Sequence, residues 1–146
     1  VLTPTGDTED WAIDLVARVW KICGAVVDHL PPAEHDRILA AVSHLPHVIA
    51  YALMERISRH ANPGRLLDYS AGAFRDVTRI AASNPELWRD VCLANHDALL
   101  EEIDLYQGVL DELASCIRLG NGEELERIFG KARDLKSRPR GKSVKG

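Results

Sequence analysis

The chain has 146 residues, of which 46% are hydrophobic and 27% are charged, a composition typical of a soluble globular protein that buries a hydrophobic core. The net charge of −4 argues against nucleic acid as a partner. The three cysteines lack a CxxC spacing, and the first ten residues lack the basic and apolar regions of a signal peptide. These features exclude a disulfide-stapled secreted fold and predict a cytoplasmic protein.

Residues 1–30 predict a strand, a helix and a second strand. The helix is expected from Thr8 to Ile22, with Asp7 or Thr8 as its N-cap, and Gly24 stops it in a left-handed position. The stretch 25–28 is rich in β-branched residues. One such crossover unit is too small to form a sheet by itself. We therefore interpret residues 1–30 as the end of a larger α/β domain.

A long helix is expected from about residue 33 to residue 59. Its stretch Ile38–Met54 contains no Asp, Glu, Lys or Arg, but it is shorter than the roughly 20 residues of a membrane span and includes polar residues. Two opposite faces of this helix carry almost no charge, so we expect both to be buried within protein and no membrane association. Pro46 should kink the helix between His44 and His47.

The rest of the chain also predicts helices. Asn84 and Pro85 suit the N-cap and first position of one helix that continues to about Leu119. Its apolar residues repeat at heptad spacing and predict packing against another long helix. They are Leu99, Ile103, Tyr106, Leu110, Leu113 and Ile117.

A turn at 120–122 and a last helix at 123–135 follow, and then a basic tail at 137–146. The fold class is therefore mainly α, with an all-helical domain over 31–136. The heptad seam predicts a homodimer, because one short C-terminal helix cannot cover it; alternatively, the helix at 33–59 covers it within one chain.

Histidines within the helix at 33–59 raise the possibility of a metal site. His44 and His47 are three residues apart, a spacing that can ligate one metal ion, and His35-Asp36 is the dipeptide of HD-type metal phosphohydrolases. That chemistry needs further His and Asp ligands on other helices, and none is convincingly placed. We therefore expect histidines that are hydrogen-bonded within the protein, and no bound metal.

The stretch "FRDVTRIA" (74–81) contains a second candidate site. Arg75 and Arg79 are four residues apart and share a helix face, with Asp76 beside them. A buried arginine needs an anionic partner. That partner is either an internal carboxylate, such as Asp36 or Asp76, or the carboxylate of a bound substrate.

Two longer stretches resemble a known family. "AEHDRILAAVSHLPHVIAYAL" and "GAFRDVTRIAASNPELWRDVCLAN" resemble the C-terminal helical half of the prephenate dehydrogenases, a family that includes cyclohexadienyl and arogenate dehydrogenases. "VLTPT" and "GAVVDHLPPAEHD" are similar to the junction between that enzyme's two domains. The resemblance implies a Rossmann-type N-terminal domain that binds NAD or NADP and a helical domain that forms an interlocked dimer. The implied reaction is oxidative decarboxylation of prephenate, or arogenate in some relatives, to give 4-hydroxyphenylpyruvate from prephenate in tyrosine biosynthesis.

The resemblance also assigns roles to individual residues. Arg79 matches the arginine that grips the substrate carboxylate, and His47 matches a histidine that faces the substrate side chain or the inhibitor tyrosine. Arg75 and Asp76 match a pair that orders the pocket. The full set of implied substrate-binding residues is Ser43, His47, Arg75, Asp76, Arg79 and Trp88.

The family's catalytic histidine and glycine-rich nucleotide loop lie in its N-terminal domain, and no GxGxxG occurs in this sequence. We therefore expect no catalytic, cofactor-binding or metal-binding residue in this chain, and no activity of this chain alone. The alternatives are a helical dimerisation module without catalytic function and an HD-type phosphohydrolase.

Overall fold

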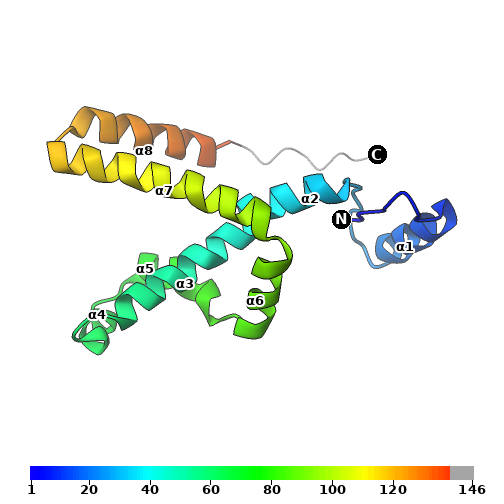
Figure 1. Ribbon diagram of the computed structural model, residues 1–146, viewed down its shortest axis with the longest axis horizontal. Coiled ribbons are helices and arrows are strands. Elements are labelled where there is room, and N and C mark those ends of the chain that lie inside the picture. The colour runs from blue at the N-terminus through cyan, green and yellow to red at the C-terminus, as the bar shows by residue number, and fades with distance from the viewer. Residues whose placement is uncertain (139–146) are drawn as a thin grey trace. The chain divides into compact units, whose positions relative to one another are not determined.

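The computed structural model describes residues 1–138, which form helices joined by short turns and no β-sheet (Figure 1). The predicted mainly α fold class is confirmed. The helices divide into two compact units, one made of residues 30–103 and one made of residues 1–29 together with the residues from Asp104 onward. All six candidate site residues lie in the first of these units. Of the predicted basic tail, residues 139–146 lie outside the described residues.

The N-terminal segment contains one helix, α1 (Asp10–Ile22), and no strand. Its N-cap is Glu9, so the prediction of Asp7 or Thr8 is wrong; the Thr8 hydroxyl instead accepts from the Thr5 backbone N–H at 3.0 Å. Gly24, at φ +83°, ends the helix region in the predicted left-handed conformation.

The two predicted strands reduce to one isolated parallel bridge between Leu2 and His29. One backbone hydrogen bond supports it, from the Leu2 N–H to the Asp28 carbonyl at 2.8 Å. The prediction of strands is therefore wrong for the described residues. The physical reason is that two short segments without neighbouring strands cannot build a hydrogen-bonded ladder.

The predicted helix at 33–59 is present in three consecutive parts, α2 (Pro32–Leu39), the π-helical turn η1 (Ala40–His44) and α3 (Leu45–Ser58). Pro46 has no N–H to donate to the carbonyl four residues earlier, so the regular series of α-helical hydrogen bonds is interrupted here. The wider turn accommodates the interruption. The irregularity lies before Pro46, one turn earlier than the predicted kink.

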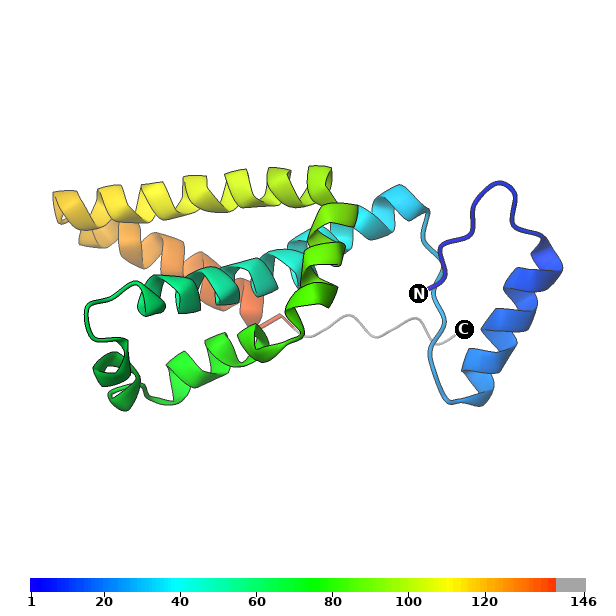
Figure 2. The ribbon, with the colours of Figure 1, turned by 60° about the horizontal axis from the view of Figure 1, so that its bottom comes forward.

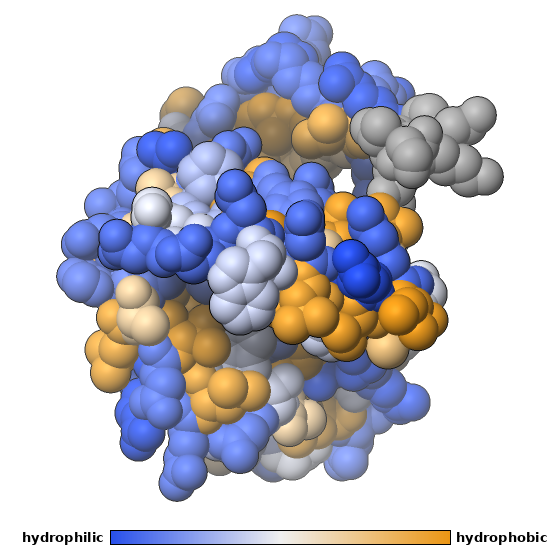
Figure 3. All heavy atoms as spheres, turned by 90° about the vertical axis from the view of Figure 1, so that its right-hand side faces the viewer, coloured by the Kyte–Doolittle hydropathy of each residue, from blue (hydrophilic) through white to orange (hydrophobic). Residues whose placement is uncertain are grey.

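The burial predicted for this helix is wrong for the single chain. Only Ala40, His44 and Ala50 are buried on it, whereas Val42 is 68% exposed. One chain does not supply enough elements to cover both faces. By length and composition the helix Pro32–Ser58 could cross a membrane, although core helices of soluble proteins meet the same criteria. Figure 3 shows that apolar side chains are exposed among polar ones on the molecular surface.

Short helices follow α3 and pack against it. They are α4 (Pro63–Asp68), α5 (Gly72–Thr78) and the 3-10 helix η2 (Arg79–Ala82), and all three contact α3. The next helix, α6 (Pro85–Ala94), begins at the predicted Asn84 cap, whose side-chain oxygen accepts from the backbone N–H groups of residues 86 and 87.

The predicted single helix at 85–119 is interrupted at Asn95, which separates α6 from α7 (His96–Leu119). Asn95 adopts φ −116° and ψ 37°, outside the helical region. Its side-chain amide hydrogen-bonds to the Asp36 carbonyl, 59 residues earlier in the chain. This tertiary contact explains why the apolar pattern alone predicted one helix too few.

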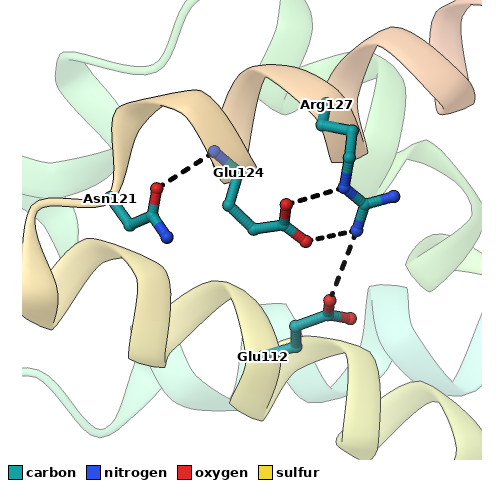
Figure 4. Close-up of polar contacts among 4 residues, drawn as sticks. All are labelled: Glu112, Asn121, Glu124 and Arg127. Carbon is teal, nitrogen blue, oxygen red and sulfur yellow. Dashed lines mark hydrogen bonds and ion pairs between the residues drawn. The ribbon is translucent and has the colours of Figure 1, made fainter.

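Helices α7 and α8 (Gly122–Lys136) form an antiparallel hairpin, seen in both ribbon views (Figures 1 and 2). Gly120, at φ +64°, makes the turn, and Asn121 caps α8 by accepting from the Glu124 N–H at 3.2 Å. Arg127 pairs with Glu124 on its own helix and with Glu112 on α7 at 3.9 Å (Figure 4). The predicted last helix is confirmed to within one residue at each end.

The predicted heptad seam is only partly covered in the single chain. Leu99 is buried, but Leu110 is exposed and Ile117 is 67% exposed. The hairpin therefore leaves an apolar strip of α7 open to solvent.

Candidate functional site

The unit of residues 30–103 brings the candidate residues onto elements that contact one another. Ser43 lies in the π-helical turn and His47 on α3, while Arg75 and Asp76 lie on α5 and Arg79 begins η2. Both α5 and η2 pack against α3. Segments about 30 residues apart in sequence therefore meet at one side of α3 (Figure 2).

His47 and Trp88 form the closest side-chain contact of the site. Their ring centroids are 3.4 Å apart and their planes differ by 18°, which is a parallel stack. Trp88 lies on α6, so this stack joins α3 to α6. Both residues were predicted from the sequence, but their direct contact was not.

One nitrogen of His47 is already used inside the protein. Its Nδ1 lies 2.9 Å from the Ser43 backbone carbonyl, and because a carbonyl can only accept, Nδ1 carries the hydrogen. Nε2 therefore remains for another partner. Ser43 orients His47 through its backbone rather than through its hydroxyl.

His44 is buried and is held by Asn95. The Asn95 side-chain nitrogen lies 3.1 Å from His44 Nδ1, which confirms the prediction that His44 hydrogen-bonds within the fold. The His44 ring also meets the edge of Trp88, at a centroid distance of 6.1 Å and an angle of 75°. Burial lowers the pKa of His44, and repulsion by His35 lowers it further, against the opposing attraction of Asp36.

Arg79 differs from its prediction in its burial. Its side chain is exposed rather than buried, on the short 3-10 helix η2. It also forms no ion pair with another described residue, so the internal alternative, a salt bridge with Asp36 or Asp76, is not found. Its guanidinium is therefore available to an anion from outside the described chain.

Arg75 and Arg79 do not share one regular helix. The α-helix that contains Arg75 and Asp76 ends at Thr78, and the backbone tightens to a 3-10 helix at Arg79. The Arg75 guanidinium donates to the Ser70 carbonyl at 3.2 Å, which secures the start of α5. The Asp76 side chain is exposed.

Two residues of the site were not identified from the sequence. The Tyr51 hydroxyl donates to the Ser83 carbonyl at 2.8 Å and ties α3 to the end of the 3-10 helix that contains Arg79. Its position four residues after His47, on the same helix face, could have indicated it. The other is Asn95, an asparagine within a helical pattern, which is a residue type that competes with helix formation.

The histidines do not assemble a metal site in the part of the chain that the structure describes. No three His, Cys, Asp or Glu side chains of residues 1–138 are grouped so as to hold a metal ion. His35 Nδ1 and Asp36 Oδ1 contact each other at 2.9 Å instead of converging with other ligands. The HD-type interpretation therefore gains no support.

The chemistry available at this site is recognition. Among residues 1–138, it offers a guanidinium without an ion-pair partner, an imidazole with one uncommitted nitrogen and the half-buried indole of Trp88. Guanidinium groups bind carboxylates through two parallel hydrogen bonds, and aromatic surfaces contact planar rings. The arrangement suits a small organic acid that contains a ring.

Comparisons with known proteins show which family the chain belongs to. The family described as "prephenate dehydrogenase, dimerization domain" matches residues 31–131. Cyclohexadienyl dehydrogenase of Zymomonas mobilis is 40% identical over 131 residues, which cover 88% of this chain and 45% of that protein. Prephenate dehydrogenase of Bacillus subtilis is 33% identical over 137 residues, with coverages of 93% and 37%.

Solved structures show the same relationship. A crystal structure of prephenate dehydrogenase from A. aeolicus, in complex with hydroxyphenyl propionate and NAD+, superposes with a TM-score of 0.84 at 36% identity and covers 92% of this chain and 47% of that one. Synechocystis arogenate dehydrogenase superposes with a TM-score of 0.77 at 28% identity, with coverages of 92% and 49%. The chain therefore spans less than half the length of these relatives.

Proposed function

The chain belongs to the prephenate dehydrogenase family through its dimerization domain, and from this premise we propose that the complete protein oxidatively decarboxylates prephenate to 4-hydroxyphenylpyruvate with NAD or NADP. Arogenate is the alternative substrate within the same family. The activity belongs to the pathway of tyrosine biosynthesis in the cytoplasm. The chain described here supplies substrate binding and dimerisation.

The observation that carries this proposal is the guanidinium of Arg79, which lies on a helix packed against the His47-bearing α3 and has no ion-pair partner among the described residues. Prephenate has carboxylates and a ring, and Arg79 is proposed to bind one carboxylate while His47 directs Nε2 to the substrate side chain. Trp88 holds the imidazole in place by stacking. Arg75 secures the start of α5 through the Ser70 carbonyl, Asp76 is proposed to order the pocket with it, and Ser43 fixes the His47 tautomer.

The nicotinamide nucleotide is assigned to a part of the protein outside this chain. The sequence contains no GxGxxG phosphate-binding loop. The residues present do not fit the cofactor, so no step of hydride transfer is assigned to them. The crystal structure of the A. aeolicus relative is a complex with NAD+, which supports a dependence on the nucleotide.

A second copy of the chain is the proposed partner. The exposed apolar residues of α7, such as Leu110 and Ile117, need cover that one chain does not provide. The family description as a dimerization domain supports this assignment. Tyrosine, which resembles the aromatic product, is proposed to inhibit by occupying the same site.

Steady-state kinetics of the complete protein test the role of Arg79. A hydrogen bond to a charged group contributes about 1.5–3 kcal/mol, so Arg79→Gln should lower kcat/KM for prephenate roughly 10- to 150-fold. Arg79→Lys should recover only part of the loss, because a lysine cannot form the paired contact. The KM for the nucleotide should stay within about twofold in both variants.

Arg59→Gln is the matched control, because Arg59 is an exposed arginine on the same unit that pairs with Glu55. If Arg79→Gln and Arg59→Gln reduce prephenate turnover equally, Arg79 does not bind substrate. If the unsubstituted protein oxidises neither prephenate nor arogenate, the proposed function itself is wrong.

A further inference from the structure

Asn95 connects three elements of the helical unit. It lies at the break between α6 and α7, and its side-chain nitrogen donates to the Asp36 carbonyl of α2 at 2.8 Å. The same nitrogen lies 3.1 Å from Nδ1 of His44 in the π-helical turn. One amide group therefore joins segments more than 50 residues apart in sequence.

This geometry determines the orientation of the amide. A backbone carbonyl can only accept, so the atom that faces Asp36 must be the Asn95 nitrogen and not its oxygen. The amide nitrogen has two hydrogens, one for the Asp36 carbonyl and one for His44. His44 Nδ1 must then accept, so His44 is neutral and carries its proton on Nε2.

The surroundings of His44 favour the same state. His44 is buried among helices, and burial lowers its pKa; His35 and His47 lower it further, while Asp36 opposes them. A charged imidazolium would also lose the hydrogen bond from Asn95, because both ring nitrogens would then be donors.

The position of His44 also affects His47, because both rings contact Trp88. The His44 ring meets the edge of the indole at 75°, and the face of the same indole stacks on His47 at 3.4 Å. The position of His44 therefore limits where Trp88 can lie, and Trp88 limits the plane of His47. The second restraint on His47 is the hydrogen bond from its Nδ1 to the Ser43 carbonyl.

We propose that Asn95 is a positioning residue, which holds His44 as the neutral Nε2–H tautomer and thereby sets the orientation of the Trp88–His47 pair toward substrate. Its contribution to substrate binding rests on the function proposed above. Its contribution to the tautomer of His44 and to the aromatic stack does not.

The test uses the complete protein labelled with ¹⁵N-histidine. In the unsubstituted protein at neutral pH, the His44 resonances, assigned by their loss in His44→Gln, should show a protonated Nε2 and an unprotonated Nδ1. The His47 ring protons should be shifted upfield by the Trp88 ring current. A charged His44 or a protonated Nδ1 would overturn the proposal, whether or not any variant of Asn95 folds.

Asn95→Asp places an acceptor where the donor lies. It should move the proton of His44 to Nδ1 or charge the ring, reduce the upfield shift of His47 and lower kcat/KM for prephenate about tenfold, with the nucleotide KM unchanged. Asn121→Asp is the matched control, because Asn121 caps α8 through its oxygen, which aspartate retains. It should change none of these readouts.

The outcomes separate the two proposals. If Asn95→Asp changes the His44 tautomer but leaves the His47 shift and kcat/KM within twofold, Asn95 is a structural residue only and the positioning role is wrong. If the unsubstituted protein oxidises neither prephenate nor arogenate, the proposed function fails, while the His44 and His47 signals still decide the positioning role.

Discussion

Removal of one oxygen, in Tyr51→Phe, tests how the 3-10 helix that contains Arg79 is held. The hydroxyl donates to the Ser83 carbonyl at 2.8 Å in a half-buried position, directly after that helix ends. A hydrogen bond of this kind contributes about 1 kcal/mol net, which corresponds to a roughly fivefold change in a local opening equilibrium. The ring remains, so packing on α3 is retained.

Hydrogen–deuterium exchange of the complete protein measures this opening directly. Peptides that span residues 79–87 should exchange roughly fivefold faster in Tyr51→Phe, whereas peptides from the α7–α8 hairpin should be unchanged. Tyr69→Phe is the matched control, because Tyr69 lies in the same unit but is 80% exposed. Uniform acceleration of all peptides, or no change at residues 79–87, would refute the view that Tyr51 holds this segment.

Three further predictions concern local structure in the complete protein. Asn84→Ala should lower the free energy of unfolding by about 1 kcal/mol, because it removes the acceptor for two N–H groups of α6, and thermal denaturation measures the loss. Asn84→Asp should cause no such loss, because aspartate retains the acceptor. Gly120→Ala should destabilise the hairpin by about 1 kcal/mol, because Gly120 has φ +64°. Gly108→Ala, within α7, should stabilise the hairpin by a similar amount. Chemical denaturation should therefore give changes of opposite sign in the free energy of unfolding of the two variants. Folding lowers the pKa of His44, so below about pH 6.5 the unfolded state binds more protons than the folded state, and the free energy of unfolding should fall as the pH drops through that range. The urea midpoint, measured against pH, should fall less steeply in His44→Gln than in the unsubstituted protein. An equally steep fall in the two proteins would contradict this assignment.

Local chemistry in the sequence predicted much of the helical framework. Asn84 followed by proline predicted the start of α6, Gly24 predicted a left-handed helix end, and residues 120–122 predicted a turn. Each of these signals depends on neighbouring residues alone, through capping geometry and backbone sterics. Such signals are readable without knowledge of the tertiary structure.

Features that depend on distant partners were not predictable in the same way. The break at Asn95 depends on the Asp36 carbonyl, which a helical periodicity cannot reveal. Arg79 was expected to be buried because apolar and small residues surround it in sequence, but exposure is set by how many elements cover a segment, and one chain covers this one incompletely. The same reason explains the exposed face at Val42.

The two histidines of "SHLPH" show how one spacing can serve a purpose other than the one it first indicates. Three residues apart on a helix, His44 and His47 face the same side, as a pair of metal ligands would. Here they bracket one indole instead, His44 at the edge of Trp88 and His47 on its face. Each has its Nδ1 hydrogen-bonded, the first as acceptor from Asn95 and the second as donor to Ser43, so the two imidazoles are held in different roles. In the proposed recognition site, a buried His44 orients the indole of Trp88, and the indole supports a half-buried His47 whose Nε2 is uncommitted among the described residues.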